Sequence, residues 1–358
     1  MLKLVAILSF LAITIRVSLG EQVPVTENTA ECGSFSSEPI APQNDGRDRQ
    51  CNANGKRKYK PRHKGIGFEI LDSESQACFV PDQEYRLLDE IIDAVASQVN
   101  YASRSNTQME QAKVISQTTS GVMTSRGFGI LIDTETLSDA LVDRNTAGEA
   151  ERHIFDCDTG SLILLTVAEN VGGLAALVEI PLPHSAFHHN YVRWLNHDGE
   201  QPLDWDMNMK SVCVTPSGLT GLDGKSMSRD ETLGYALSLR AKLWERQARY
   251  DQAVSDYRAA MKLYGGSSPY NNFAWLIATR NVPGRQDLQA EALSDAQKAV
   301  SMWPSANYRD TLACVYALHR NFVKAAVVEQ QAIDDTPKAA YKHRLEMFEK
   351  ENRDCTGE

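Results

Sequence analysis

The sequence predicts two folded parts, an α+β domain followed by an all-α domain of helical repeats. The first observation is an apolar helical run at 160–171 that is followed by three strand-like segments ending at residue 206. The second is a set of helical patterns after about residue 230, in which small residues recur at a regular spacing. A length of 358 residues also fits two domains better than one.

The first twenty residues are typical of a secretory signal. Lys3 precedes an uncharged apolar run from Leu4 to Ile15, and small residues follow at Ser18 and Gly20. About twelve apolar residues are too few for the roughly 20 that span a bilayer. We therefore expect residues 1–20 to be a signal peptide. After its cleavage, the mature chain should be periplasmic or secreted and should not be stably inserted in a membrane. The alternative is an uncleaved N-terminal anchor.

The charge of the chain argues against a nucleic-acid partner. Its formal net charge is -10, and removal of the signal takes away two cations and no acid. One basic run, from Lys56 to Lys64, departs from this balance. Because it has no helical or strand periodicity, we expect a solvated loop there.

All seven cysteines follow the predicted signal: Cys32, Cys51, Cys78, Cys157, Cys213, Cys314 and Cys355. In an oxidising compartment an odd number indicates one free thiol. We expect pairing among Cys32, Cys51 and Cys78, but the spacing does not determine which of them are joined. The sequence context described below selects Cys157 as the free thiol.

Residues 21–81 are expected to form a disordered or disulfide-tied lead-in, since the stretch up to residue 66 is polar and lacks apolar periodicity. From Asp82 apolar residues recur at helical spacing, which predicts a helix over 82–101 and a more polar one over about 106–118. A short apolar stretch at 128–132 and a capped helical turn at 136–142 follow.

The run at 160–171 is apolar nearly all round, which is typical of a buried helix, and Gly172-Gly173 ends it. Strands are expected over 174–180, 190–195 and 200–206. Between the last two, Asp198-Gly199 is a strong hairpin turn signal. The α+β domain is therefore expected over 82–222.

The all-α domain is expected over 230–338, with a C-terminal helix or tail over 339–358. Small residues lie seven apart in three units, and Pro304 and Pro337 close the second and third units. The pairs are Ala253 and Ala260, Ala292 and Ala299, and Ala325 and Ala332. This pattern resembles tetratricopeptide repeats, with an insertion around 281–284. The resemblance implies a protein or peptide partner bound by the repeats; the alternative is an ordinary helical bundle.

Cys157 stands just before the buried helix, which Asp158 or Thr159 could cap. At that place the helix dipole is expected to lower the thiol pKa toward neutrality. A catalytic cysteine would occupy such a position, although a lone cysteine before a helix is also a common small buried residue.

A histidine partner is chosen by the geometry of the hairpin. A two-residue turn at 198–199 pairs Tyr191 with Asp206 and Arg193 with Asp204. Because side chains alternate along a strand, His189 and Asp206 then share one face as diagonal neighbours. Asp204 is one step further from the imidazole, and Pro202 could introduce a bulge that shifts this register.

The same region resembles the bacterial transglutaminase-like family. The motifs are Asp-Cys-Asp-Thr-Gly-Ser-Leu at 156–162, Leu-Val-Glu-Ile-Pro at 177–181, His-Asn-Tyr-Val-Arg-Trp at 189–194 and Trp-Asp at 205–206, with Leu-Ser-Asp-Ala-Leu at 137–141 upstream. The resemblance implies an α+β transglutaminase/papain-like domain followed by an all-α tetratricopeptide-repeat domain. It implies Cys157 as nucleophile, His189 as base and Asp206 as orienting acid, with no cofactor and no metal.

Several alternatives remain open. The segment between Pro181 and His189 is longer than in the family, so His184 or His188 could be the base instead. These histidines together with Cys157 could also bind a metal ion, although the prolines disfavour the helix that a zinc pair at 184 and 188 would need.

The predicted function is that of an exported cysteine peptidase or amidase acting by acyl transfer through Cys157, His189 and Asp206. The alternative is a catalytically silent protein-binding scaffold of the same fold. The residues do not determine the substrate, the choice between hydrolysis and crosslinking, or the oligomeric state.

Overall fold

The computed structural model describes residues 55–102, 107–130, 136–144, 152–181, 188–195, 203–208, 211–212, 224–280, 282 and 284–355. Several predicted features lie outside these residues, namely the signal peptide, the turn at 198–199, Cys32, Cys51, Cys213 and His184.

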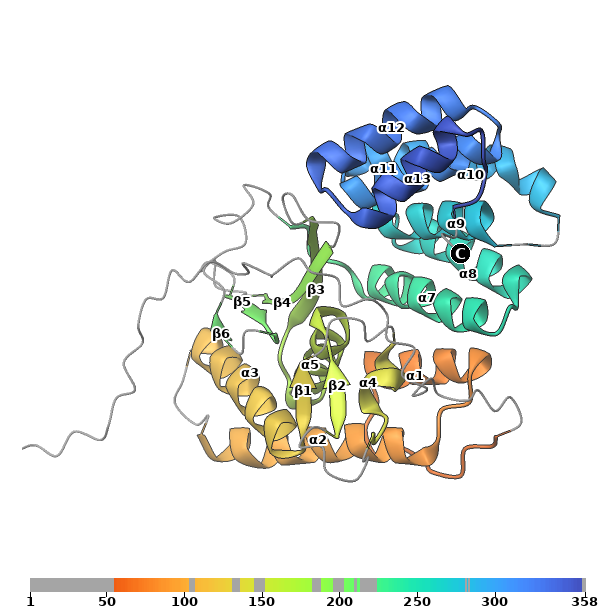
Figure 1. Cartoon of the computed structure of the whole chain (residues 1–358). Helices are drawn as coiled ribbons and strands as arrows, with labels where there is room; N and C mark the ends of the chain where they lie inside the picture. Colours follow the sequence, from red (N-terminus) through yellow and green to blue (C-terminus); the bar gives the residue numbers. More distant parts are fainter. Residues whose placement is uncertain are drawn as a thin grey trace, which may run out of the picture. The chain divides into compact units, whose positions relative to one another are not determined.

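The described part of the chain is mostly helical, with two small sheets (Figure 1). The helices are α1 (Ile66–Ala77), α2 (Asp82–Ala102), α3 (Gln108–Ser125), α4 (Leu137–Leu141), α5 (Cys157–Val171), α7 (Arg229–Arg246), α8 (Tyr250–Leu263), α9 (Ser267–Thr279), α10 (Arg285–Met302), α11 (Ala306–Leu318), α12 (Phe322–Asp335) and α13 (Ala339–Glu349). The strands are β1 (Phe128–Ile130), β2 (His153–Phe155), β3 (Ala175–Pro181), β4 (His188–Trp194), β5 (Leu203–Asp206) and β6 (Ser211–Val212). Within the described ranges, no helix has both the length and the apolar content needed to cross a bilayer.

Helix α1 lies within the segment that was expected to be a lead-in. Its apolar residues Ile66, Ile70 and Leu71 are buried, and the Ile66 N–H donates to Oε2 of Glu169 on α5 at 2.6 Å. Residues 66–77 are therefore helical, unlike the disordered lead-in that was expected there. Local sequence pattern did not predict this helix, because it packs against α5 and α7, which lie far away in the sequence. Cys78, just after α1, is disulfide-bonded.

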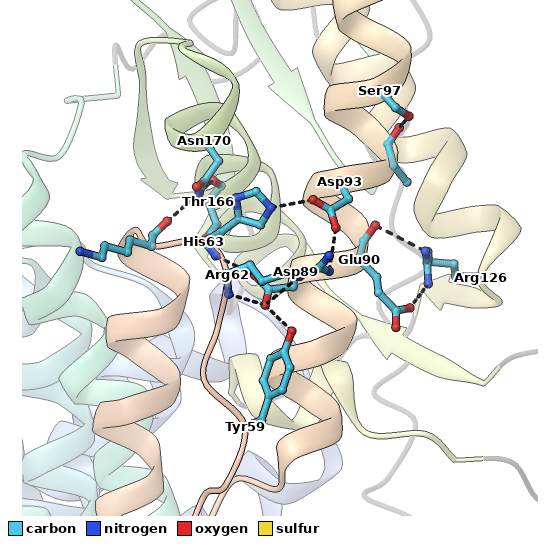
Figure 2. Close-up of polar contacts among 12 residues, drawn as sticks. Tyr59, Arg62, His63, Asp89, Glu90, Asp93, Ser97, Arg126, Thr166 and Asn170 are labelled. Atoms are coloured by element: carbon cyan, nitrogen blue, oxygen red, sulfur yellow. Dashed lines mark hydrogen bonds and ion pairs between the residues drawn. The ribbon is translucent and has the colours of Figure 1, made fainter.

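The basic run at 56–64 is bound to acidic residues of α2 (Figure 2). Nη2 of Arg62 lies 2.6 Å from Asp93, and Nε2 of His63 lies 2.8 Å from the same carboxylate. The buried Asp89 accepts the Tyr59 hydroxyl at 2.6 Å and the backbone N–H groups of Arg62 and His63 at 2.9 and 3.0 Å. The run is an exposed loop, as expected, and Tyr59, Arg62 and His63 attach it to α2.

The next elements follow the sequence pattern closely. Helix α2 confirms the helix expected over 82–101. A capping box between Thr107 and Glu110 starts α3, which continues past the expected end at about residue 118 to Ser125. Thr136 caps α4 as predicted, with its side chain accepting from the Asp139 N–H. The apolar stretch at 128–130 forms β1, which pairs in parallel with β2.

Helix α5 is the predicted buried helix, and it begins three residues earlier than expected, at Cys157. All residues from Thr159 to Ala168 are buried. The helix ends at Gly172, whose φ of 83° is the left-handed conformation typical of a helix C-terminus. Helix α5 packs against α1, α2, β3 and β4, and so forms the centre of the main hydrophobic core.

The second sheet has four antiparallel strands in the order β3-β4-β5-β6. Strands β4 and β5 pair Arg193 with Asp204 and Val192 with Trp205, which is the register predicted from a two-residue turn. Nε and Nη2 of Arg193 donate to the two oxygens of Asp204 at 2.8 and 2.9 Å. This bidentate ion pair holds the register on the face that also carries His189.

Helices α7 to α12 pack as three consecutive pairs, α7 with α8, α9 with α10 and α11 with α12, and α13 packs on α12 (Figure 1). The six alanines expected where helices cross are fully buried, and each pair of them lies on the second helix of its unit: Ala253 and Ala260, Ala292 and Ala299, and Ala325 and Ala332. The first and third units also share a turn, in which Ala248 and Arg320 have φ of 54° and 57°.

A disulfide joins Cys314 of α11 to Cys355 beyond α13. Sequence spacing did not predict this pair, because connectivity depends on which helices the fold brings together. It ties the end of the described chain to the helical part.

Candidate active site

The N-terminus of α5 is built by a reciprocal cap. Oδ1 of Asp156 accepts the Thr159 N–H at 3.0 Å, and Oγ1 of Thr159 accepts the Asp156 N–H at 3.1 Å. The cap is therefore Asp156, not Asp158 or Thr159 as expected, because these two side chains satisfy each other's backbone groups. Cys157 is consequently the first residue of the helix.

Cys157 is half-buried, and it is the free cysteine among the described residues. Its Sγ donates to Oδ1 of Asp158 at 3.2 Å. Burial raises the pKa of the thiol well above its ordinary value, and the charges of Asp158 and Asp156 act in the same direction, whereas the backbone N–H of Asn190 favours the thiolate. The expectation of a lowered pKa is therefore wrong for this structure, because desolvation and two neighbouring carboxylates outweigh the helix dipole.

His189 and Asp206 form the contact that the register predicts. Nε2 of His189 lies 2.8 Å from Oδ2 of Asp206, and both side chains are buried. Oδ1 of Asp206 accepts the Asn208 N–H at 2.8 Å, which helps to orient the carboxylate. Since Nε2 is engaged, Nδ1 is the ring nitrogen left for another group.

The two faces of β4 separate the predicted site residues. His189 pairs across the strands with Ile180 and shares its face with Tyr191, away from α5. Asn190 points the other way, and its Nδ2 donates to Oδ1 of Asp158 at 2.7 Å. Cys157 lies beside the β4 backbone, since the Asn190 N–H acts on its sulfur, but it has no hydrogen bond to His189 or Asp206.

His188, one of the open alternatives for the base, does not contact Asp206. Its Nε2 lies 2.7 Å from the Tyr308 hydroxyl, its ring packs edge-on against Trp303, and its Nδ1 lies 3.4 Å from Glu179. Burial lowers the pKa of His188 to about 3, so the imidazole is neutral. Because His188 and His189 point to opposite faces of β4, they do not converge on a common metal ion.

A buried polar network connects the α5 face of the sheet with the helical pairs, and local sequence pattern did not reveal it. The Tyr235 hydroxyl of α7 donates to Oδ2 of Asp158 at 2.6 Å and accepts from Nδ2 of Asn190 at 2.7 Å. Glu179 of β3 accepts the hydroxyl of Tyr264, which follows α8, and burial raises the pKa of this carboxyl to about 7. These tyrosines lie far from Cys157 in sequence, so only the fold brings them together.

The described residues contain no group of three or more His, Cys, Asp or Glu side chains that could hold a metal ion. The arrangement offers three chemical features: a free thiol at a helix start, a buried imidazole–carboxylate pair that joins β4 and β5, and, on the α5 face of the sheet, a hydroxyl network that reaches α7. A comparison with models of known protein families finds no family that matches this chain, and a comparison with curated proteins finds no match either.

Proposed function

We propose that this chain is an exported, transglutaminase-like cysteine peptidase or amidase, with Cys157 as nucleophile, His189 as base and Asp206 as orienting acid. The observation that carries the proposal is the buried 2.8 Å hydrogen bond between His189 and Asp206. Asn190 follows His189 on β4, and the Asn190 backbone N–H interacts with the Cys157 sulfur. The Cys157 thiol of α5 and the His189 imidazole of β4 thus lie next to consecutive residues of β4, while Asp206 is on the neighbouring strand β5.

The proposed reaction is acyl transfer. The Cys157 sulfur attacks the carbonyl carbon of an amide while its proton passes to Nδ1 of His189, and Asp206 holds the imidazolium through Nε2. This proton transfer requires the His189 ring to reach the α5 side of β4, because in the described structure the ring lies on the face that it shares with Tyr191. When the C–N bond breaks, the imidazolium protonates the leaving amine and a thioester remains. Water or a second amine attacks the thioester and returns the thiol.

The resting state of Cys157 places a condition on this reaction. The thiol is protonated and donates to Asp158, so its proton must move to His189 during the attack rather than before it. The Cys157 backbone N–H at the helix start is the proposed donor to the developing oxyanion.

The helical pairs support a proposed tetratricopeptide-like domain that binds a protein or peptide. Three pairs carry fully buried alanines seven residues apart, and the first and third pairs repeat the same left-handed turn residue. Export through the predicted signal peptide to the periplasm or the exterior is consistent with the Cys314–Cys355 disulfide, since such bonds persist in oxidising compartments.

A catalytically silent binding scaffold is the second candidate, and one observation favours it. Cys157 has a raised thiol pKa and, among the residues that the structure describes, no hydrogen bond to a histidine. In that case the thiol would be a buried partner of Asp158, and binding by the helical pairs would be the whole function.

The test uses the mature chain and a peptide acyloxymethyl ketone, a probe that alkylates cysteines in peptidase-like sites. We expect a mass adduct on Cys157 in the wild type, none in Cys157→Ala, and a rate lowered at least about 100-fold in His189→Gln, since general base catalysis contributes about that much. His343→Gln, an exposed histidine on α13, is the matched control. Equal labelling of the wild type and His189→Gln would favour the scaffold.

A further inference from the structure

A closed set of three hydrogen bonds joins Asp158 of α5, Asn190 of β4 and Tyr235 of α7. The Tyr235 hydroxyl donates to Oδ2 of Asp158 at 2.6 Å. Nδ2 of Asn190 donates to Oδ1 of the same carboxylate at 2.7 Å and to the Tyr235 oxygen at 2.7 Å. Because a carboxylate can only accept, the direction of each bond follows from the chemistry of the groups. Both oxygens of Asp158 are therefore held, one by α7 and the other by the sheet.

The same carboxylate is the hydrogen-bond partner of the Cys157 thiol. Sγ of Cys157 donates to Oδ1 of Asp158 at 3.2 Å. An S–H group is a weak donor, so this bond is not expected to fix the carboxylate by itself. The N–H and O–H groups of Asn190 and Tyr235 make stronger bonds to a charged acceptor. The place of the carboxylate beside the sulfur is therefore set by these two residues.

The two donors are buried, whereas the carboxylate is half-buried. Asn190 is fully buried and 4% of the Tyr235 surface is exposed, so neither donor can readily exchange Asp158 for water. Asp158 itself retains part of its contact with solvent, and its carboxylate could gain water by turning outward. Its inward orientation therefore depends on the buried donors.

The other titratable groups around Asp158 do not hold it in this place. Among the described residues these groups are Asp156, the Glu179 carboxyl of β3 and the Tyr264 hydroxyl that follows α8. The two acids repel its charge, and the Tyr264 hydroxyl donates to Glu179 instead. Lys242 of α7 acts on Asp156. The hydrogen bond from α7 is therefore the contact by which the helical part orients Asp158.

Contacts on both sides of Tyr235 fix the position of α7. At the start of the helix, Nη1 and Nη2 of Arg229 donate to the two carboxylate oxygens of Glu69 on α1, each at 3.0 Å. Further along, Nη1 of Arg240 donates to Oγ of Ser73 on α1 at 2.9 Å. The segment of α7 between these contacts is thus held against α1, and the Tyr235 hydroxyl has a defined place.

We propose that Tyr235 is a positioning residue for Cys157: its hydroxyl holds the Asp158 carboxylate where that carboxylate accepts the hydrogen bond of the thiol. The all-α part thereby completes the site through its first helix and keeps the thiol in its resting form. Loss of the hydroxyl lets the carboxylate turn toward solvent, away from the sulfur. The proposal rests on the proposed function only in taking Cys157 as the reactive thiol, and it does not require turnover.

The first test is the infrared S–H stretching band of the full-length mature protein, assigned to Cys157 by subtracting the spectrum of Cys157→Ala. A hydrogen-bonded S–H group absorbs at a lower frequency than a free one, so the band reports this bond whatever the exposure of the thiol. We expect Tyr235→Phe to move the band up to the frequency found in Asp158→Ala, which lacks the acceptor. Tyr257→Phe is the matched control, because it removes a buried hydroxyl that contacts a different carboxylate, Glu245.

The second test is the rate at which iodoacetamide alkylates Cys157 at pH 7.5, in a double-mutant cycle of Tyr235→Phe and Asp158→Ala. A thiol freed from the carboxylate ionises more readily, so Tyr235→Phe should be alkylated about tenfold faster than the wild type. In the Asp158→Ala background the same substitution should change the rate less than about twofold, because it acts through Asp158. A general loosening of α7 would instead raise the rate in both backgrounds.

Phenylalanine retains the ring that packs edge-on against Tyr264, so the fold of Tyr235→Phe should be intact. Circular dichroism checks this, and Tyr235→Met replaces the variant if it is misfolded. Two results would overturn the proposal: an S–H band in the Tyr235 variant at the wild-type frequency, or an equal gain in rate with and without Asp158. Neither measurement involves turnover, so failure of the acyl-transfer proposal leaves both tests unchanged.

Discussion

The protonation of Cys157 is set by its immediate neighbours. A cysteine at a helix N-terminus ordinarily has a lowered pKa, but here the sulfur is desolvated and lies beside the carboxylates of Asp158 and Asp156. The burial effect is the largest, so the local sequence motif alone indicates the wrong direction.

We predict that removing the Asp158 charge makes Cys157 more reactive. Iodoacetamide should alkylate wild-type Cys157 slowly at pH 7.5, and Asp158→Asn should raise the rate about tenfold for each unit by which the thiol pKa falls. Mass spectrometry of samples quenched at successive times measures the rates. Asp230→Asn, an exposed acid on α7, should leave the rate unchanged. Wild-type labelling as fast at pH 6 as at pH 9 would contradict the raised pKa.

Glu179 should make the stability depend on pH. Its pKa in the fold is raised from 4.5 to about 7 by burial, so its stabilising effect is complete below pH 4.5 and is lost as the pH rises through 7. Between pH 5 and 8, the wild type should therefore lose on the order of 2 kcal/mol of unfolding free energy relative to Glu179→Gln.

Urea unfolding of both proteins at each pH measures this difference. Glutamine retains an oxygen acceptor for the Tyr264 hydroxyl, so the comparison isolates the charge. If the two proteins show parallel pH profiles, Glu179 does not titrate in this range.

At the scale of single elements, the start of α5 depends on the reciprocal cap between Asp156 and Thr159. Thr159→Val removes the hydroxyl that accepts the Asp156 N–H and donates to the Asp156 carboxylate at 2.9 Å. We expect a loss of about 1–2 kcal/mol of unfolding free energy, measured by urea titration. Thr124→Val on α3, which loses a hydroxyl bonded within its own helix, should cost less. Equal losses would mean that the cap does not stabilise α5 specifically.

The Cys314–Cys355 disulfide should stabilise the end of the helical part. It joins residues 41 apart, and closing a loop of that length in the unfolded chain is worth about 4 kcal/mol in the chain-entropy model. Cys355→Ser should therefore lower the melting temperature. A reducing agent should lower that of the wild type at least as much, because it also reduces the disulfide of Cys78. Cys157→Ser is the control, because it leaves this bond intact. A wild-type melting temperature that does not respond to reduction would exclude the stabilising role.

At the scale of the whole molecule, the sheet and the helical pairs are connected by polar contacts rather than by apolar packing alone. The Tyr308 hydroxyl of α11 bonds to His188 of β4 at 2.7 Å and to Ser267 of α9 at 3.3 Å. A buried polar group that loses its hydrogen-bond partner destabilises the fold. Because unfolding of either the sheet or the helical pairs would break these bonds, the junction should couple the unfolding of both.

We predict that Tyr308→Phe lowers the unfolding free energy by about 1–3 kcal/mol, since it leaves the buried His188 Nε2 without that hydroxyl. Urea unfolding followed by circular dichroism measures the change. Tyr316→Phe on the same helix is the control, because the hydrogen bond that the Tyr316 hydroxyl accepts from Gln297 is exposed to solvent. If the two variants are equally stable, the junction does not contribute measurably to stability.

Much of the fold could be predicted from sequence because it depends on local pattern. The buried helix α5, the register that pairs Arg193 with Asp204, and the buried alanines of α8, α10 and α12 follow from apolar runs, turn residues and spacing. The contact between His189 and Asp206 follows from the same register. Helix α1 was missed, because its N-terminus is completed by Glu169 from a distant helix.

The sequence by itself determined the periodic features, namely the order of the helices and strands and the residues that share a strand face. Only the tertiary structure decided the protonation of Cys157, the neutral state of His188, the partners of Glu179 and the disulfide between Cys314 and Cys355. The physical reason is the sequence distance over which each kind of interaction acts. Periodicity and turn chemistry act over a few residues, whereas desolvation and buried hydrogen bonds depend on which distant segments exclude water from each group.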